Sequence, residues 1–324
     1  MTSQSLPVYP ARDFTVTDGV AEGDPITFAD DLVMDDIYQL RPAARRERLA
    51  MATDETGFVV DPQTETGRPG NRLHLDCCLT FMARDGSTCE ALVLVEVENG
   101  NVAEVYVLPL APLAPRTDYR LVGADRHAAI TRLAEVACVS FTRGTHITMA
   151  SGAQVPIEAL RPGDRLLTRD DGPQEVRWIG QTTLRATGAF APVMIRKGAL
   201  HNENDLIVSP DHRIFVYQRQ DHLGAGRAEV LVKVRHLING TSVVQLDGGF
   251  VEYFQLLFDD HQIVFAEGIA AESLLIDPRT RAALPEGLGG AGHRPRRHLS
   301  YEVQESLLSG ADAVSLLRRA SQSG

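Results

Sequence analysis

The frequency of turn-forming clusters in the second half of the chain constrains its fold more than any other feature. From residue 138 to about residue 276, short β-patterned runs alternate with clusters rich in Gly, Pro, Asn and Asp. These clusters are Arg161-Pro162-Gly163-Asp164, Asp170-Asp171-Gly172-Pro173, Ile238-Asn239-Gly240-Thr241 and Asp247-Gly248-Gly249. Such residues preset or permit the backbone angles of tight turns. Turns this frequent predict an all-β module.

Residues 1–137 are predicted to form a separate, strand-rich α+β domain. Its first 50 residues or so hold scattered prolines and end in the helix-compatible run 43–50, so we expect an irregular lead-in and one short helix. Apolar runs predict strands at 73–77, 91–97 and 102–108. Asn99-Gly100, between the last two runs, predicts a β-hairpin.

The remaining segments complete a three-part chain. Residues 109–115 are rich in proline and are expected to form an edge or a connector, and residues 118–136 an extended stretch followed by a helix. A Gly-rich linker is expected after residue 280, and residues 301–319 resemble a terminal amphipathic helix. The predicted parts are a domain at 1–137, a second domain at 138–280, and a linker with a C-terminal helix at 281–324.

Composition and charge limit the classes of function. With 324 residues, 44% of them hydrophobic, the chain can bury a core in each of two domains. Its net charge of -11 argues against nucleic-acid binding, which needs clustered Lys and Arg. We see no basic segment followed by an apolar one at the start, and no membrane-spanning run. A cytoplasmic protein, or one exported without a conventional signal peptide, is expected.

The cysteines indicate reduced thiols. Cys77 and Cys78 are adjacent and cannot easily bridge each other, so a disulfide framework is not expected. His74 with these two residues and Cys89 could be drawn as a zinc site, but the spacing matches no usual structural zinc pattern. We therefore expect neither a metal nor a cofactor.

Cys138 is different because it stands at the first residue of the predicted β module. A histidine, His212, follows far downstream in the run Ser209-Pro210-Asp211-His212. A thiol at this place, with an imidazole from another strand, could attack the preceding peptide bond at Ala137 and form a thioester. His212 could protonate the leaving α-amine. An ordinary packing cysteine and an ordinary histidine are the alternative reading of this pair.

Ser209 is a third candidate, because its hydroxyl could donate a hydrogen bond to the scissile carbonyl. Residues three apart in an extended segment point to opposite faces, so Ser209 and His212 converge only if the chain bends between them. Pro210 favours such a bend.

Several blocks of sequence follow one another in order along the second module: Cys138–Ile147, Val155–Asp164, Val176–Gly180, Ala191–Leu200, Leu206–Arg213 and His261–Ile269. Together these blocks resemble a bacterial Hint domain, a member of the Hedgehog/intein autoprocessing superfamily. Ordered blocks are far more specific than one short motif. The resemblance covers about residues 138–276 and implies a compact, pseudo-symmetric, all-β fold. It also implies that Cys138 is the nucleophile, that His212 is the block histidine, and that Ser209 replaces a threonine.

The end of the module departs from the splicing inteins. Glu272 and Ser273 stand where those inteins have a His-Asn pair, and serine has no carboxamide to cyclise. The closing block of the family usually has an aspartate near its start, where residues 253–256 here read Tyr-Phe-Gln-Leu. The resemblance thus implies cleavage of the chain's own N-terminal segment in cis, with water or a small nucleophile resolving the thioester, and no full splicing.

Two other classes of function stay open. A catalytically inactive Hint-like scaffold or interaction module would fit the altered closing block. A cysteine hydrolase acting in trans is disfavoured, because no asparagine or acidic residue with a recognisable motif accompanies His212.

Overall fold

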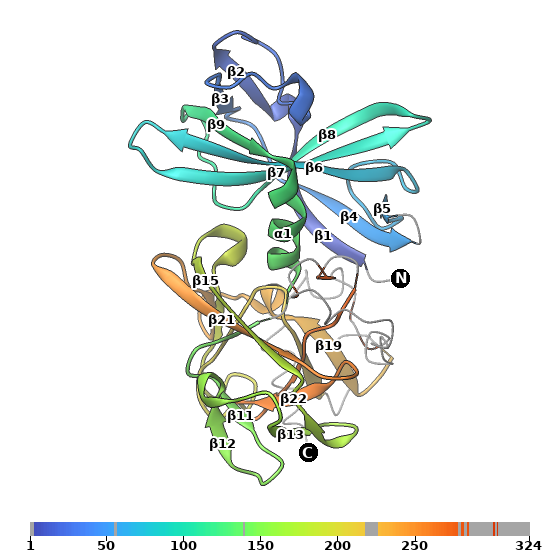
Figure 1. Ribbon diagram of the computed structural model, residues 1–324, viewed down its shortest axis with the longest axis vertical. Helices are drawn as coiled ribbons and strands as arrows, with labels where there is room; N and C mark the ends of the chain where they lie inside the picture. The colour runs from blue at the N-terminus through green and yellow to red at the C-terminus, as the bar shows by residue number, and fades with distance from the viewer. Residues whose placement is uncertain are drawn as a thin grey trace. The chain divides into compact units, whose positions relative to one another are not determined.

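The computed structural model describes residues 3–54, 57–138, 140–217, 226–277, 280, 281, 284, 301 and 303. The chain forms two compact units, Met1–Glu135 and Val136–Gly324 (Figure 1). Within the described residues the fold is mainly β, as predicted, and no helix there is long and apolar enough to cross a membrane. The predicted C-terminal helix and most of the predicted linker lie outside the described residues.

The N-terminal unit is built on one antiparallel sheet. Its strands are β1 (Ser3–Pro10), β2 (Phe14–Asp18), β3 (Ile37–Leu40), β4 (Glu47–Asp54), β5 (Gly57–Val60), β6 (Arg72–Ala83), β7 (Thr88–Glu98), β8 (Asn101–Pro109) and β9 (Tyr119–Asp125). Its helices are the 3-10 turns η1 (Ala11–Asp13) and η2 (Ala29–Asp31) and the α-helix α1 (Arg126–Ala137). The strand order is β2-β3-β9-β6-β5-β4-β1-β8-β7, and β6 also pairs with β7, so the path from β6 to β7 closes into a ring.

Local sequence signals account for much of this unit. Asn99 and Gly100 both have positive φ, 52° and 81°, and form the two-residue hairpin turn predicted between β7 and β8. The strands predicted at 73–77, 91–97 and 102–108 lie within β6, β7 and β8, and the extended stretch and helix predicted in 118–136 are β9 and α1.

The helix predicted at residues 43–50 is wrong. Residues from Glu47 onward belong to β4, which pairs with β1 on one side and β5 on the other. The middle of this strand, Leu49 to Ala52, is buried on both faces. Helix propensity is a weak local preference, and burial between two partner strands overrides it.

The N-terminal unit has an aromatic core. Phe14 stacks on Tyr38 with ring centroids 5.4 Å apart, and its edge-to-face contact with Phe81 has a centroid distance of 5.2 Å. Cys77 is buried in the same core, and Cys78 is also buried. All four cysteines are free thiols. Aromatic and aliphatic packing is therefore what holds this unit together.

The second unit contains two antiparallel sheets. Its strands are β10 (Phe141–Thr142), β11 (His146–Thr148), β12 (Gln154–Pro156), β13 (Arg165–Thr168), β14 (Gly172–Glu175), β15 (Trp178–Arg185), β16 (Val193–Ile195), β17 (Leu206–Val208), β18 (Arg213–Tyr217), β19 (Glu229–Lys233), β20 (Val243–Gln245), β21 (Phe250–Leu257), β22 (Ile263–Ala266) and β23 (Ile269–Glu272). The 3-10 turns η3 (Ile157–Ala159), η4 (Gly188–Phe190) and η5 (Val234–Leu237) lie between them.

One sheet of this unit has the order β15-β21-β10-β17-β16-β20, and the other runs β12-β11-β22-β23-β18-β19, with β13 joined to β22 and β14 to β13. The antiparallel pair of long strands β15 and β21 is visible in Figure 1. Apolar side chains from both sheets share one core cluster. Within the described residues of this unit the regular elements are strands and 3-10 turns, in agreement with the predicted all-β module.

Strand β10 positions the site. It lies between β17 and β21, with Phe141 paired to Val208 on one side and to Phe254 on the other. In an antiparallel ladder the residue before Phe141 faces the residue after each partner. The register therefore sets Ser140 beside Ser209 and beside Gln255.

Candidate functional site

A tight turn links Ser209 to His212. The His212 amide donates to the Ser209 carbonyl over 3.0 Å, and the intervening residues are Pro210 and Asp211. The Asp211 carboxylate pairs with Arg235 at 2.9 Å, which holds the turn from outside. The predicted bend is present, so Ser209 and His212 belong to one local structure.

Ser140 meets the end of this turn. Its amide donates to the Ser209 hydroxyl over 3.0 Å, and its carbonyl accepts from the Ser209 amide over 2.9 Å. On its other side, the Gln255 side-chain amide donates to the Ser140 hydroxyl over 3.3 Å. Ser140 and Ser209 are both buried. The amide, the carbonyl and the hydroxyl of one residue are thus all engaged by the site.

His212 is fully buried beside the same residue. Its Nδ1 lies 3.1 Å from the Ser140 carbonyl oxygen, and its Nε2 lies 3.0 Å from the Glu272 carbonyl oxygen. Burial lowers the pKa of His212, while the charge of Glu272 and the two carbonyl contacts act in the opposite direction. A neutral imidazole donates to only one of these oxygens, whereas the protonated ring donates to both. The two carbonyl contacts therefore favour the protonated ring.

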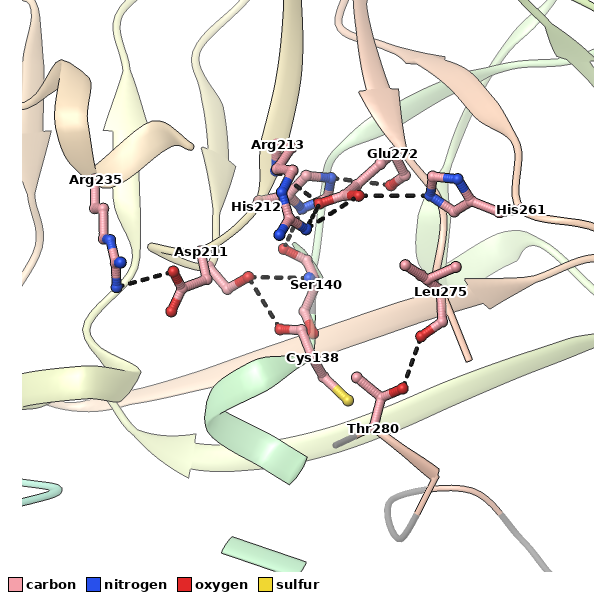
Figure 2. A network of polar contacts seen from close by, with 11 residues as sticks. Cys138, Ser140, Asp211, His212, Arg213, Arg235, His261, Glu272, Leu275 and Thr280 are labelled. Carbon is pink, nitrogen blue, oxygen red and sulfur yellow. Dashed lines mark hydrogen bonds and ion pairs between the residues drawn. The ribbon is translucent and has the colours of Figure 1, made fainter. Parts of the chain in front are cut away.

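A buried charge cluster surrounds His212 (Figure 2). The Glu272 carboxylate accepts from the Arg213 amide and guanidinium, both over 3.1 Å, and lies 3.4 Å from His261 Nε2. Burial raises the pKa of Glu272, but the charge of Arg213 and the contact with His261 outweigh it and lower the pKa to about 2. Glu272 therefore stays ionised and fixes the strand end whose carbonyl meets His212.

Cys138 is placed differently from His212 and Ser209. Its side chain is buried in an apolar cluster with Leu257 and Leu274, against which Trp178 packs. In Figure 2 the sulfur points away from His212 and Ser140. The contact between Ser209 and Cys138 is made by the Cys138 carbonyl, which accepts from the Ser209 hydroxyl over 3.4 Å. Of the three residues named from the sequence, the structure brings together Ser209 and His212, and joins Cys138 to them through its backbone.

Several residues of this site were given no role from the sequence. Ser140, Arg213 and His261 lie in blocks that resemble the Hint family, and Gln255 lies at the start of the closing block, but their partners in the site lie far away in the chain. Ser140 directly precedes β10, and Ser209 directly follows β17, the strand that pairs with β10. Knowledge of this pairing would have identified Ser140. Strand pairing over such a distance is not readable from local sequence.

The two residues that replace the His-Asn pair of splicing inteins are both held by buried contacts. Glu272 is the buried partner of Arg213, and the Ser273 hydroxyl accepts from the Gln262 amide over 2.9 Å. Within the described part of the chain, no group of three or more His, Cys, Asp or Glu side chains is arranged to hold a metal ion.

Comparison with protein families agrees with this architecture. Residues 139–278 match the family model described as the Hint domain. The second unit therefore contains a Hint domain, a class of domain with a general capacity for autoprocessing. No curated protein matches the chain.

Proposed function

We propose that this chain cleaves itself once, at the N-terminal edge of its Hint domain. The reaction is an acyl shift, in which a side-chain nucleophile replaces the amide nitrogen on the preceding carbonyl carbon. Water or another small nucleophile then resolves the acyl intermediate. The substrate is the N-terminal segment of the same chain.

One observation carries this proposal. Ser140, in the segment that enters the Hint domain, contacts Ser209, His212 and Gln255 at once. An enzyme acting on other molecules needs room for a substrate, whereas here the backbone of the chain itself fills the contacts. This arrangement supports cleavage in cis.

The resemblance to the Hint family implies that Cys138 is the nucleophile. Its attack would break the Ala137–Cys138 peptide bond and form a thioester. His212 would protonate the leaving amine, and Ser209 would supply hydrogen bonds to the backbone at the domain entrance. The reaction class is unchanged if a hydroxyl performs the attack, because the intermediate is then an ester.

Cleavage on one side only is supported by the end of the domain. Excision of a splicing element needs a terminal carboxamide that cyclises, and Glu272 and Ser273 offer none. Both residues are buried, and their side chains are engaged with Arg213 and with the Gln262 amide. We therefore propose that residues after the Hint domain stay attached to it.

Intact-mass measurement of the purified full chain tests this function. Incubation with hydroxylamine, which attacks esters and thioesters, is expected to yield two fragments that meet at the start of the Hint domain. His212→Ala is expected to slow their appearance. A chain that stays whole in hydroxylamine and in dithiothreitol contradicts self-cleavage and indicates the alternative, a catalytically inactive Hint-like scaffold.

A further inference from the structure

Ser140 lies where the contacts of the site converge. Strand register places it opposite Ser209 on one side and Gln255 on the other. Its three polar groups, the amide, the carbonyl and the hydroxyl, meet Ser209, His212 and Gln255. Because a buried polar group costs free energy unless it is paired, such a concentration on one serine calls for a functional explanation.

We propose that Ser140 is the nucleophile of the self-cleavage reaction, and that the bond broken is Val139–Ser140. This inference rests on the proposed function and replaces Cys138 in the attacking role. The Hint match begins at residue 139, so Ser140 lies inside it and Cys138 lies outside.

The reaction balances as an N-to-O acyl shift followed by hydrolysis. Ser140 Oγ bonds to the Val139 carbonyl carbon, the C–N bond breaks, and the proton that leaves Oγ ends on the freed α-amine of Ser140. Water then attacks the ester, which releases a carboxylate at Val139 and restores the Ser140 hydroxyl. The net change is hydrolysis of one peptide bond.

The neighbouring groups are suited to this chemistry. Ser209 Oγ is 3.0 Å from the nitrogen that becomes the amine, so it can hydrogen bond the amine as it forms. The Gln255 amide lies 3.3 Å from the attacking oxygen and fixes its rotamer. His212 Nδ1, at the Ser140 carbonyl, can offer positive charge or a proton beside the same residue.

The Cys138 side chain lies in a different environment. Its thiol packs among Leu257, Leu274 and Trp178, and its sulfur points away from His212 (Figure 2). Ser209 touches the Cys138 carbonyl, which belongs to the peptide bond after the cysteine. The geometry thus favours the hydroxyl two residues later over the thiol.

Four forms of the full chain separate these possibilities: the natural sequence, Ser140→Ala, Ser140→Cys and Cys138→Ala. Each is incubated in buffer, in dithiothreitol and in hydroxylamine, and the fragments are identified by intact mass and by sequencing of the new N-terminus. Fluorescence of the single tryptophan, Trp178, checks that the Hint domain of each variant is folded.

The inference predicts a distinct pattern. Hydroxylamine releases a fragment that ends at Val139 and a fragment that begins with a free Ser140, and Cys138→Ala still yields the same break at Val139–Ser140. Ser140→Ala yields no fragments. Ser140→Cys makes the chain sensitive to dithiothreitol, because thiols exchange readily with thioesters and slowly with oxygen esters. This new cleavage by dithiothreitol still tests the role of Ser140 if the Ser140→Ala variant fails to fold.

Two results overturn the inference in different ways. A fragment ending at Ala137 that disappears in Cys138→Ala leaves self-cleavage intact and returns the attacking role to Cys138. A natural chain and a Ser140→Cys variant that both stay whole under all three conditions contradict the proposed function itself.

Discussion

The two units of this chain bury carboxylates in opposite ways. In the N-terminal unit, Glu96 is 1% exposed and accepts from the Tyr106 hydroxyl at 2.7 Å, the Asn71 side chain at 2.6 Å and the Arg68 amide at 2.9 Å. In the Hint domain, Glu272 is 0% exposed and is held by the charged Arg213 and by His261. The first set is made of uncharged donors, and the second contains a cation and a titratable ring.

The different partners of Glu96 and Glu272 indicate different roles for the two buried carboxylates. Neutral donors that satisfy one carboxylate fix a loop against a strand. A buried ion pair beside a second histidine is an inefficient way to gain stability, because removing charges from water costs free energy. The charged cluster does, however, hold His212 against the backbone of Ser140. We therefore expect variants in the Hint cluster to affect cleavage and variants in the N-terminal unit to affect stability alone.

The largest effect is expected for His212→Ala. Loss of a positioned acid–base group lowers the cleavage rate by about 100-fold to 10,000-fold. The matched control is His74→Ala, at an exposed position on β6 in the N-terminal unit, which should cleave at the natural rate. Rates come from the intact-mass time course in hydroxylamine. Equal rates for both variants would remove His212 from the reaction.

Glu272→Gln and Glu96→Gln compare the two buried carboxylates directly. Glu272→Gln removes the buried negative charge that pairs with Arg213 and is expected to lower the free energy of unfolding by about 3–5 kcal/mol. Glu96→Gln disturbs hydrogen bonds from neutral donors and should cost about 1–3 kcal/mol. Urea titration followed by Trp178 fluorescence reports on the Hint domain, and far-ultraviolet circular dichroism reports on the whole chain.

Low pH is expected to weaken the ion pair between Glu272 and Arg213. The folded pKa of Glu272, about 2, lies below its ordinary value of 4.5. The stabilisation is therefore present above the ordinary value and is lost as the pH falls through the folded value. Glu272→Gln should remove this part of the acid sensitivity. Unchanged acid unfolding in the variant would show that the ion pair does not set it.

The features of the fold that could be predicted are those that a short stretch of sequence determines by itself. Asn99-Gly100 predicted the hairpin because positive φ at both positions is a local requirement. Turn clusters such as Asp170–Pro173 predicted the all-β character of the Hint domain, where Gly172 has a φ of 64°. The wrong helix at residues 43–50 shows the limit, because there the partner strands β1 and β5 decide the structure.

The residues of the candidate site could likewise be predicted only where one short segment contains them. Ser209 and His212 share one turn, so a motif four residues long carries both. Ser140 and Gln255 come to this turn through pairing of β10 with β17 and β21, across 69 residues in one case and 115 in the other. No local pattern carries that pairing. The apolar packing of the Cys138 thiol is likewise a property of its tertiary neighbours.

The pH dependence of cleavage sharpens the role of His212. Its folded pKa lies below the ordinary value of 6.5, so the ring is mostly neutral at neutral pH. If the protonated ring assists the leaving amine, the rate should rise by up to about tenfold per unit as the pH falls from about 8 towards about 6. His212→Ala serves as the control, because it shares any pH effect on hydroxylamine. A parallel rise in that variant would contradict the protonation role.

The same shift has a stability consequence with a fixed sign. A histidine with a lowered folded pKa binds protons more weakly in the folded chain than in the unfolded one. The Hint domain should therefore lose stability as the pH drops below 6.5, by an amount that His212→Ala abolishes. Trp178 fluorescence in urea at several pH values measures it.

The smallest effect is expected at a glycine beside the site. A Cβ at Gly180 would lie 2.3 Å from Trp178 and 2.7 Å from Gln255 Oε1, and the register pairs Gly180 with Gln255. Gly180→Ala should therefore displace the side chain that touches Ser140 and slow cleavage several-fold, at a stability cost of about 1–3 kcal/mol. In the N-terminal unit, a Cβ at Gly123 would make only ordinary contact with Thr80 at 3.4 Å, so Gly123→Ala is the matched control. Cleavage by Gly180→Ala at the natural rate, in a domain destabilised as expected, would show that Gln255 supports the fold and not the attack by Ser140.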